Sequence, residues 1–237
     1  MRNERRVGTT EYTMRRFYVM IQLSNRMGRR EKRMIRNIIF DVGKVLVSYE
    51  PDAYMQQLGI SSEDQAKINK AMFQNKLWDE SDQGLGTPDE LLEKFIAGAP
   101  ELAETITKIH NTVGNTVELL PYAMDWILDL KARGYHVYIL SNYGENMMNQ
   151  TRDKLKFLPL MDGEVFSYTI KKMKPDPEIY EYLCDEYGLE PEESVFLDDR
   201  PENIKGAENC GIHGIVFRSY EQAKNELDAF LQEQADS

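Results

Sequence analysis

The stretch Ile38-Ile39-Phe40-Asp41-Val42-Gly43 lies near the beginning of the part of this 237-residue sequence that we expect to fold. Its three consecutive apolar residues are typical of a buried parallel strand, and the aspartate and glycine after them are typical of a polar turn at its end. Asp41 should therefore stand at the carboxyl edge of a sheet, where open α/β sheets bind their ligands. Gly43 permits an unusual backbone angle or a close approach of a ligand to the main chain.

Strands and helices alternate regularly after residue 119. The apolar patterns predict strands at 135–140, 165–170, 194–197 and 213–217, and helices at 119–133, 145–155, 176–187, 201–210 and 220–232. Such alternation implies right-handed βαβ units and a parallel sheet with helices on both faces. The fold class that we expect is therefore α/β, with a Rossmann-like core.

Residues 52–115 interrupt this pattern, because they contain helical segments and no convincing strand. Thr87-Pro88-Asp89-Glu90 is a strong helix start, with a threonine cap, a proline in the first turn and a glutamate at the capping-box position. A helical insertion after the first strand of a parallel sheet is expected to form a small cap over the strand ends. We therefore predict a core at 37–51 and 116–237 and a helical cap at 52–115.

Residues 1–36 differ sharply in charge from the rest of the chain. They hold 11 basic and 3 acidic residues, a net charge of +8, whereas the other 201 residues hold 18 basic and 37 acidic ones, a net charge of −19. Such a basic head is either an arm for nucleic acid, a membrane or a targeting machinery, or a solvated extension before a true start at Met34. We favour the second interpretation and expect 1–36 to be disordered or a mis-assigned start.

The remaining composition argues against large charged partners. No stretch approaches the roughly 18 apolar residues of a membrane helix, and a charge of −19 is unfavourable for nucleic acid. Cys184 and Cys210 form neither a disulfide framework nor a CxxC motif, so we expect reduced thiols in a cytoplasmic protein. We expect no nucleic-acid or membrane partner, and we assign no oligomeric state.

Two further polar motifs adjoin predicted strand and helix ends. In Leu140-Ser141-Asn142, the polar pair either caps the following helix or, with main-chain N–H groups at the helix start, binds an anion. Lys174 precedes Pro175, which favours an extended conformation outside the next helix. It is either an ordinary surface lysine or a positive charge placed to neutralise a phosphate.

Asp198-Asp199 follows the strand predicted at 194–197. Adjacent carboxylates at a strand end repel each other unless they share a cation. Hard oxygen ligands favour Mg²⁺, which is usually held by one or two carboxylates together with substrate phosphate. One of the two aspartates could instead cap the helix that begins near Pro201, and we expect one ligand and one cap or neighbouring group.

In this order the four motifs resemble those of the haloacid dehalogenase-like (HAD) hydrolase superfamily, and the resemblance covers residues 37–220. It implies that Asp41 attacks phosphorus and forms an aspartyl-phosphate. It also implies that the transferring phosphoryl group is bound by Ser141, by the amide of Asn142 and by Lys174.

The same resemblance implies a Mg²⁺ site. Its ligands would be Asp41, the backbone carbonyl of Gly43 and Asp199, with Asp198 beside them. Asn203 stands where many members of the superfamily carry a further acid. The substrate implied is a small phosphorylated metabolite.

A narrower resemblance is to the bacterial α-D-glucose-1-phosphate phosphatase group. The chain shares its Asp-x-Gly-x-Val beginning at Asp41, its Leu-Ser-Asn motif, its ending at 198–207 and a similar cap segment at 78–84. Trp78 and Tyr143 are candidate substrate contacts, as are Phe73, Asp79 and the loop at 81–86. Each of them could instead pack inside the protein or face the solvent.

Gly43 departs from most phosphatases of the superfamily, which carry there a second aspartate as general acid and base. Loss of a general acid costs ~10²–10⁴ in rate, and it matters least when the leaving group is a weak base, such as an anomeric sugar hydroxyl. We therefore predict a Mg²⁺-dependent phosphomonoesterase for a small sugar phosphate, first of all a sugar 1-phosphate. Glu50, the nearest carboxylate downstream, is a less favoured replacement for the acid.

Other interpretations of the same motifs remain. Hydrolytic dehalogenation on this scaffold needs no Mg²⁺ and has little use for Lys174 and the acidic pair together. Gly43 leaves open a catalytically silent HAD-like binding protein, and it disfavours a phosphosugar mutase, which needs the missing acid. A response-regulator receiver is disfavoured because its acidic pair precedes the phosphorylated aspartate, and because a chain of 237 residues is about twice the length it needs.

Overall fold

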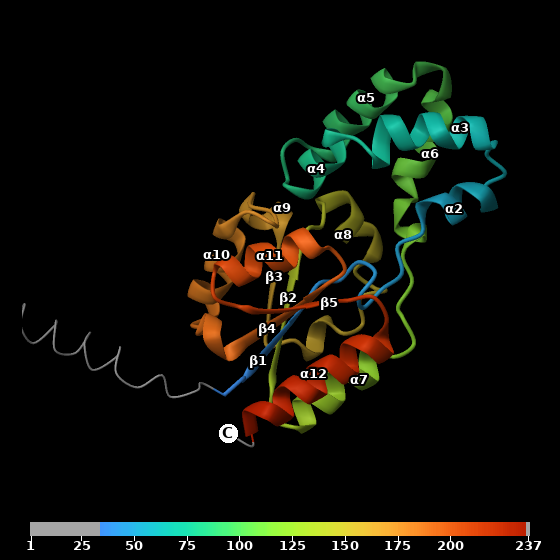
Figure 1. Cartoon of the computed structure of the whole chain (residues 1–237). Coiled ribbons are helices and arrows are strands. Elements are labelled where there is room, and N and C mark those ends of the chain that lie inside the picture. Colours follow the sequence, from blue (N-terminus) through green and yellow to red (C-terminus); the bar gives the residue numbers. More distant parts are fainter. Residues whose placement is uncertain (1–33, 236–237) are drawn as a thin grey trace, which may run out of the picture. The chain divides into compact units, whose positions relative to one another are not determined.

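The computed structural model describes residues 34–235, which contain a sheet of five parallel strands in the order β3-β2-β1-β4-β5 (Figure 1). The strands are β1 (Asn37–Phe40), β2 (His136–Ser141), β3 (Gly163–Phe166), β4 (Ser194–Asp198) and β5 (His213–Val216). In β1, the central strand, Phe40 lies in register with Ile139 of β2 and Leu197 of β4. The carboxyl ends of these three strands therefore lie side by side. The predicted α/β fold class is confirmed.

Helices cover both faces of this sheet (Figure 1). The helices of the core are α7 (Ala123–Ala132), which precedes β2, and, after β2, α8 (Glu145–Thr151), α9 (Ser167–Ile170), α10 (Pro177–Tyr187), α11 (Pro201–Asn209) and α12 (Tyr220–Ala235), with 3₁₀ turns at 158–160 and 191–193. Successive side chains of a strand point to opposite faces. Accordingly, Phe40 packs in one buried cluster with Trp126 of α7 and Leu227 of α12, whereas Ile39 packs in another with Tyr180 of α10.

The chain between β1 and β2 is helical from Pro51 to Thr116, and we call this segment the helical insertion. Its elements are α2 (Pro51–Gln57), α3 (Ser62–Ile68), a π-helical turn (Asn69–Phe73), α4 (Lys76–Asp82), α5 (Pro88–Gly98), α6 (Ala103–Asn111) and 3₁₀ turns at 100–102 and 113–116. It has its own apolar cluster, which includes Met55 and Phe95. The predicted capping box is present, since Glu90 N donates to Thr87 Oγ1 and Thr87 N donates to Glu90 Oε2.

The strand predicted at 165–170 is too long. β3 ends at Phe166, and the next residues form α9. Thr169 Oγ1 donates to the carbonyl of Phe166 (2.7 Å), a local side-chain bond that competes with the ladder, and Ser167 Oγ accepts the N–H of Tyr143 (2.9 Å).

Two predicted helices are shorter than expected. The one predicted at 119–133 begins only at Ala123, because Leu119 bridges to Val47 and Leu120 N bonds to the carbonyl of Leu46. The one predicted at 145–155 ends at Thr151. The predicted basic extension at 1–36 lies, up to residue 33, outside the described residues. Within 34–235, no helix has the length and apolar character needed to cross a membrane.

Candidate active site

Three polar side chains stand at the carboxyl edge of the sheet because of the strand register. Asp41 follows β1 directly, Ser141 is the last residue of β2 and Asp198 is the last residue of β4. The main-chain N–H of Asp41 continues the ladder to the carbonyl of Leu197 (2.9 Å), which fixes its position. Ser141 Oγ donates to Asp41 Oδ1 at 2.7 Å. The neighbouring strands therefore hold a hydroxyl and two carboxylates together.

Lys174 reaches the same point from the loop before α10, and it is buried. Its Nζ lies 2.9 Å from Asp41 Oδ1 and 2.6 Å from Asp198 Oδ2, and it also donates to the carbonyl of Leu140 (2.9 Å). Burial alone would lower the pKa of Lys174, but the attraction of Asp198 and Asp41 outweighs it and raises the pKa above its ordinary value. A surface lysine, the alternative from the sequence, is therefore wrong.

The side chain of Asn142 fixes the main chain of Lys174. Asn142 Nδ2 donates to the carbonyl of Lys174 (2.9 Å), and Asn142 Oδ1 accepts the N–H of Lys174 (2.8 Å). These two bonds tie the end of β2 to the lysine loop, which lies 32 residues away in the sequence. The alternative that Ser141 and Asn142 cap α8 is wrong, because Gly144 stands at the start of that helix and no side chain caps it.

Asp41 has an unusual acidity. Burial raises the pKa of its carboxyl to about 6, with a further rise from Asp198, while Lys174 and the hydroxyl of Ser141 act in the opposite direction. Its carboxylate form still predominates above that pH. The position combines a charged carboxylate with a cation and a hydroxyl that contact the same oxygen.

The two acidic neighbours at the end of β4 differ in their surroundings. Asp198 is fully buried, and its oxygens accept bonds from Lys174, from the N–H of Arg200 (2.8 Å) and from Nδ2 of Asn203 (3.0 Å to each oxygen). The side chain of Asp199 is 24% exposed, and its Oδ2 lies 3.9 Å from Lys44 Nζ. Asp198 therefore holds the lysine and the start of α11, while Asp199 faces outward.

These groups fit a small divalent cation. Single oxygens of Asp41, Asp198 and Asp199 lie within 4.8 Å of one another. Lys174 is the cation that contacts two of them, so the cluster keeps an excess of negative charge. Oδ1 of Asn203 is also buried and lacks a hydrogen-bond partner among the described residues. An oxygen-rich cluster with excess negative charge matches the chemistry that Mg²⁺ prefers.

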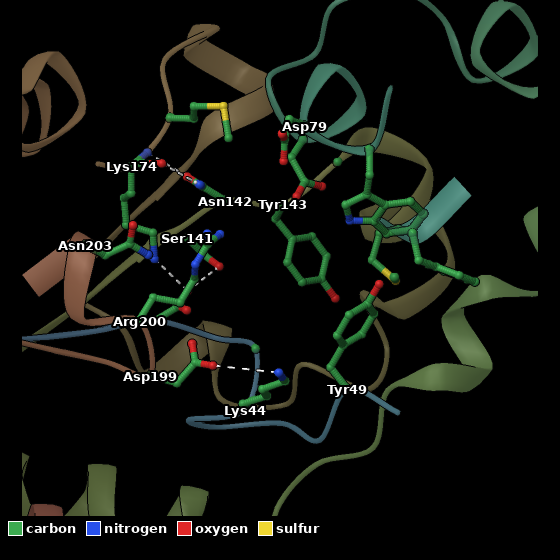
Figure 2. A pocket seen from close by; sticks show the side chains of 18 of the residues that line it. Lys44, Tyr49, Asp79, Ser141, Asn142, Tyr143, Lys174, Asp199, Arg200 and Asn203 are labelled. Carbon is green, nitrogen blue, oxygen red and sulfur yellow. Dashed lines mark hydrogen bonds and ion pairs between the residues drawn. The ribbon is translucent and has the colours of Figure 1, made fainter. Parts of the chain in front are cut away.

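A pocket of about 600 Å³ opens above this edge, between the core and the helical insertion. Figure 2 shows Ser141, Lys174 and Asn203 on one side, with Asp79 and Tyr49 on the other. The pocket is also lined by Asp41, Gly43, Lys44, Phe73, Asn75, Trp78, Asp82, Asn142, Tyr143, Gly144, Asp199 and Arg200.

Both predicted specificity residues line this pocket and also pack inside the protein. Trp78 contacts Phe73 at a centroid distance of 4.9 Å and Phe95 at 6.4 Å. Tyr143 is buried, and its hydroxyl lies 2.7 Å from Oγ1 of Thr151. Trp78 and Tyr143 thus both line the pocket and take part in the internal packing of the protein.

Of the two uses of Gly43 that the sequence left open, an unusual backbone angle and a close approach of a ligand, the first is not present. The positive φ value in this turn belongs to Lys44 (59°), and a Cβ on Gly43 would meet no atom within 4 Å. Glu50, the carboxylate considered as a replacement acid, is exposed and does not line the pocket. Of the loop predicted to line the pocket at 81–86, Asp82, which closes α4, does line it, but no catalytic role was predicted for it. An acid-rich segment at 78–84 was the available signal, but a pattern does not tell which of its acids faces the pocket.

The sequence is similar to those of a known family and of several characterised proteins. A family model described as haloacid dehalogenase-like hydrolase matches residues 35–211. The chain is 29% identical over 209 residues to D-ribitol-5-phosphate phosphatase of Bacteroides thetaiotaomicron, which covers 84% of this chain and 99% of that protein. It is 26% identical over 182 residues to a sesquiterpene phosphatase of Aspergillus oryzae, with 75% of this chain and 87% of that protein covered.

Solved structures show the same fold. A HAD-family enzyme of Bacteroides thetaiotaomicron aligns with a TM-score of 0.66 at 21% identity, over 82% of this chain and 99% of that chain. A second structure of that enzyme, in complex with magnesium and inorganic phosphate, aligns with a TM-score of 0.63 at 21% identity, over 79% and 98%.

Proposed function

This chain belongs to the haloacid dehalogenase-like hydrolase family, and we propose that it is a Mg²⁺-dependent phosphomonoesterase for a small sugar phosphate. One observation carries the proposal: a single oxygen of Asp41 is contacted by Ser141 Oγ at 2.7 Å and by Lys174 Nζ at 2.9 Å at the floor of the pocket. A carboxylate with a hydroxyl and an ammonium beside it has the parts needed to accept a phosphoryl group.

In the proposed reaction, a carboxylate oxygen of Asp41 attacks phosphorus while the bond from phosphorus to the ester oxygen breaks. Water then attacks the aspartyl-phosphate, the bond from phosphorus to Asp41 breaks, and inorganic phosphate leaves. Lys174, the hydroxyl of Ser141 and the main-chain N–H of Asn142 bind the phosphoryl oxygens and stabilise the charge that they share in the transition state. Asp198 and Leu140 hold two of the three N–H groups of the Lys174 ammonium, so the N–H that contacts Asp41 in the free protein is the one that turns to the phosphoryl oxygen.

We infer that Mg²⁺ is the cofactor, held by Asp41, the carbonyl of Gly43 and Asp199, with Asp198 beside them. The fit of the acidic cluster described above supports this choice. When bound, the ion supplies positive charge that offsets the repulsion between the Asp41 carboxylate and the anionic phosphate. Asp198 keeps the separate task of holding Lys174.

We infer that the helical insertion acts as a cap that binds the alcohol part of the substrate. Trp78 offers an apolar ring face, and Tyr143 adds a second aromatic wall. Nearby Asp79 and Asn75 could accept hydrogen bonds from sugar hydroxyls. The similarity to D-ribitol-5-phosphate phosphatase supports a small polyhydroxylated ester as the substrate. A sugar 1-phosphate is the first candidate, and a cytoplasmic location stays a prediction.

The test is phosphate release from a panel of sugar 1-, 5- and 6-phosphates with Mg²⁺, repeated with EDTA and with Asp41→Asn. We expect release from at least one ester, loss with EDTA and recovery when Mg²⁺ is restored. Asp41→Asn should reduce kcat by roughly 10⁴-fold or more, because the loss of one member of a catalytic unit removes most of the rate enhancement of the whole unit. Release that is indifferent to both changes contradicts the proposal, as does halide release from 2-haloacids without phosphate release. Binding of phosphate without turnover would instead support the silent binding protein.

A further inference from the structure

The departing alcohol needs a proton, and Gly43 has no side chain to give one. Four carboxyl groups line the pocket: Asp41, Asp79, Asp82 and Asp199. Asp41 is assigned as the nucleophile and Asp199 as a cation ligand, which leaves the two acids of α4. We propose that Asp82 is the general acid and base of the reaction, delivered from the helical insertion in place of an acid at position 43. This inference rests on the proposed function and deepens it.

Two hydrogen bonds fix the main chain around Asp82 against the core. Ser167 Oγ donates to the carbonyl of Asp82 and accepts the N–H of Tyr143 at 2.9 Å. Gln83 Nε2 donates to the carbonyl of Lys171 at 3.1 Å. One serine therefore joins the end of α4 directly to the loop that follows β2, so the acid has a defined position relative to the phosphate site.

Two glycines allow this close contact between the insertion and the core. A Cβ on Gly144 would lie 2.8 Å from Ser81 Oγ and 3.3 Å from Asp82 Oδ1, and a Cβ on Gly84 would lie 2.6 Å from the carbonyl of Tyr168. The carboxylate of Asp82 therefore lies close to the main chain of Gly144. Gly144 follows Asn142 by two residues in the sequence, and the N–H of Asn142 is proposed to bind the phosphoryl group. The Asp82 carboxylate is therefore next to the loop that carries the phosphate site.

The electrostatic surroundings suit a group that gives and takes a proton near neutral pH. Burial raises the pKa of Asp82 to about 7, with further rises from Asp79 and Asp41, while the Gly144 N–H and Lys174 oppose them. A general acid and base works best when its pKa lies near the operating pH. The charged and titratable groups that interact with it are Asp79 of its own helix, Asp41 and Lys174 of the core, Tyr49 and Tyr143.

The two half-reactions then balance. When Asp41 attacks phosphorus and the ester P–O bond breaks, the proton of the Asp82 carboxyl passes to the leaving oxygen and forms the alcohol. When water attacks the aspartyl-phosphate, one water proton passes back to the Asp82 carboxylate as the bond to Asp41 breaks. Asp82 ends in its starting form. Esters with poor leaving groups, such as sugar 6-phosphates, become substrates as well as sugar 1-phosphates.

The test compares Asp82→Asn with wild type on two esters, using the full chain with Mg²⁺. Glucose 6-phosphate has an alkoxide leaving group that needs a proton, whereas p-nitrophenolate leaves without one. In Asp82→Asn, kcat/KM for glucose 6-phosphate should fall by ~10²–10⁴, and kcat/KM for p-nitrophenyl phosphate by less than about tenfold. In wild type, kcat/KM for glucose 6-phosphate should fall above pH 7 as the carboxyl loses its proton. With p-nitrophenyl phosphate this fall should be absent.

Glu80→Gln is the matched control, because Glu80 lies on the same helix but pairs with Lys94 (3.0 Å) and does not line the pocket. It should leave both values unchanged. An equal loss on both esters in Asp82→Asn, with an unchanged melting temperature, would overturn the inference and assign Asp82 a positioning role. Unchanged activity on both would also overturn it. If wild type releases phosphate from neither ester and from no member of the sugar phosphate panel, the proposed function itself fails.

Discussion

The core and the helical insertion contribute different kinds of groups to one pocket. From the sheet edge come charged groups that fix one another, with Lys174 between Asp41 and Asp198 at less than 3 Å from each. From the insertion come aromatic rings and an acid, and its contact with the core near the site depends on hydrogen bonds such as that of Gln83 to Lys171. The phosphate site is thus part of the sheet itself. The proposed proton donor, Asp82, is instead positioned by the contacts of the helical insertion with the core.

Removing the charge of Lys174 should have the largest effect, because this lysine holds the charged groups of the core together. Lys174→Met leaves Asp41 and Asp198 as buried carboxylates without their cation, which typically costs about 3–5 kcal/mol of unfolding free energy. Chemical unfolding measures this loss, and phosphate release should disappear with it. Lys172→Met, at an exposed lysine two residues earlier, is the control and should change neither. A stable Lys174→Met protein would show that the carboxylates are not held by this lysine.

Restoring an acid on the core side should compensate for its loss from the insertion. Position 43 has a φ outside the positive range and open space for a side chain, so Gly43→Asp should fold. In the Asp82→Asn background, Gly43→Asp should raise kcat/KM for glucose 6-phosphate by up to about 10²-fold, since a general acid contributes ~10²–10⁴. Gly43→Asn, which has the same shape without the proton, is the control and should not. Equal rescue by both would mean that the gain is not proton transfer.

The same contrast explains what could be predicted from the sequence. Asp41, Ser141 and Asp198 each follow a short apolar run, and the parallel pairing of those runs dictates that their ends meet. The resemblance to HAD-like hydrolases, an α/β fold and an enzyme of the phosphatase type are accordingly confirmed. The sequence alone left open whether Lys174 is a surface lysine, because its burial depends on two carboxylates at the ends of other strands, a long-range relation that no local pattern encodes.

Asp82 shows the limit most clearly. The segment 78–84 contains three acids, of which Asp79 and Asp82 line the pocket. Which acids do so depends on the packing of α4 against residues 144 and 167–171. Those contacts join positions more than 60 residues apart. The short helix α9 was missed for a related reason, because Ser167 bonds to Tyr143 and Asp82, which are distant in the sequence, while Thr169 bonds back to Phe166 instead of extending β3.

Disturbing the contact between the two regions should have an intermediate effect. In Gly144→Ala, the added Cβ would lie 2.8 Å from Ser81 Oγ and 3.1 Å from the carbonyl of Ser81, so the end of α4 must shift. We expect kcat/KM to fall about tenfold for glucose 6-phosphate and less for p-nitrophenyl phosphate, since a displaced general acid loses part of its contribution. Gly134→Ala is the control for a damaged glycine away from the pocket: because the φ of Gly134 is 90°, an alanine there is strained and should lower the melting temperature, but kcat/KM should stay unchanged for both esters. Equal losses on both esters would place the damage in phosphate binding.

Weakening the insertion far from its contact with the core should have the smallest effect and should spare the chemistry. Thr87→Ala removes the capping hydrogen bond to Glu90 N at the start of α5, which typically costs about 1 kcal/mol. For a domain of this size that corresponds to a fall in melting temperature of roughly 2–4 °C, which calorimetry can measure. At 25 °C, kcat/KM should stay unchanged for both esters, because the capping box lies outside the pocket and the bonds of Ser167 and Gln83 remain. A selective loss on glucose 6-phosphate would mean that the position of Asp82 depends on the stability of the whole insertion, not on its local contacts with the core.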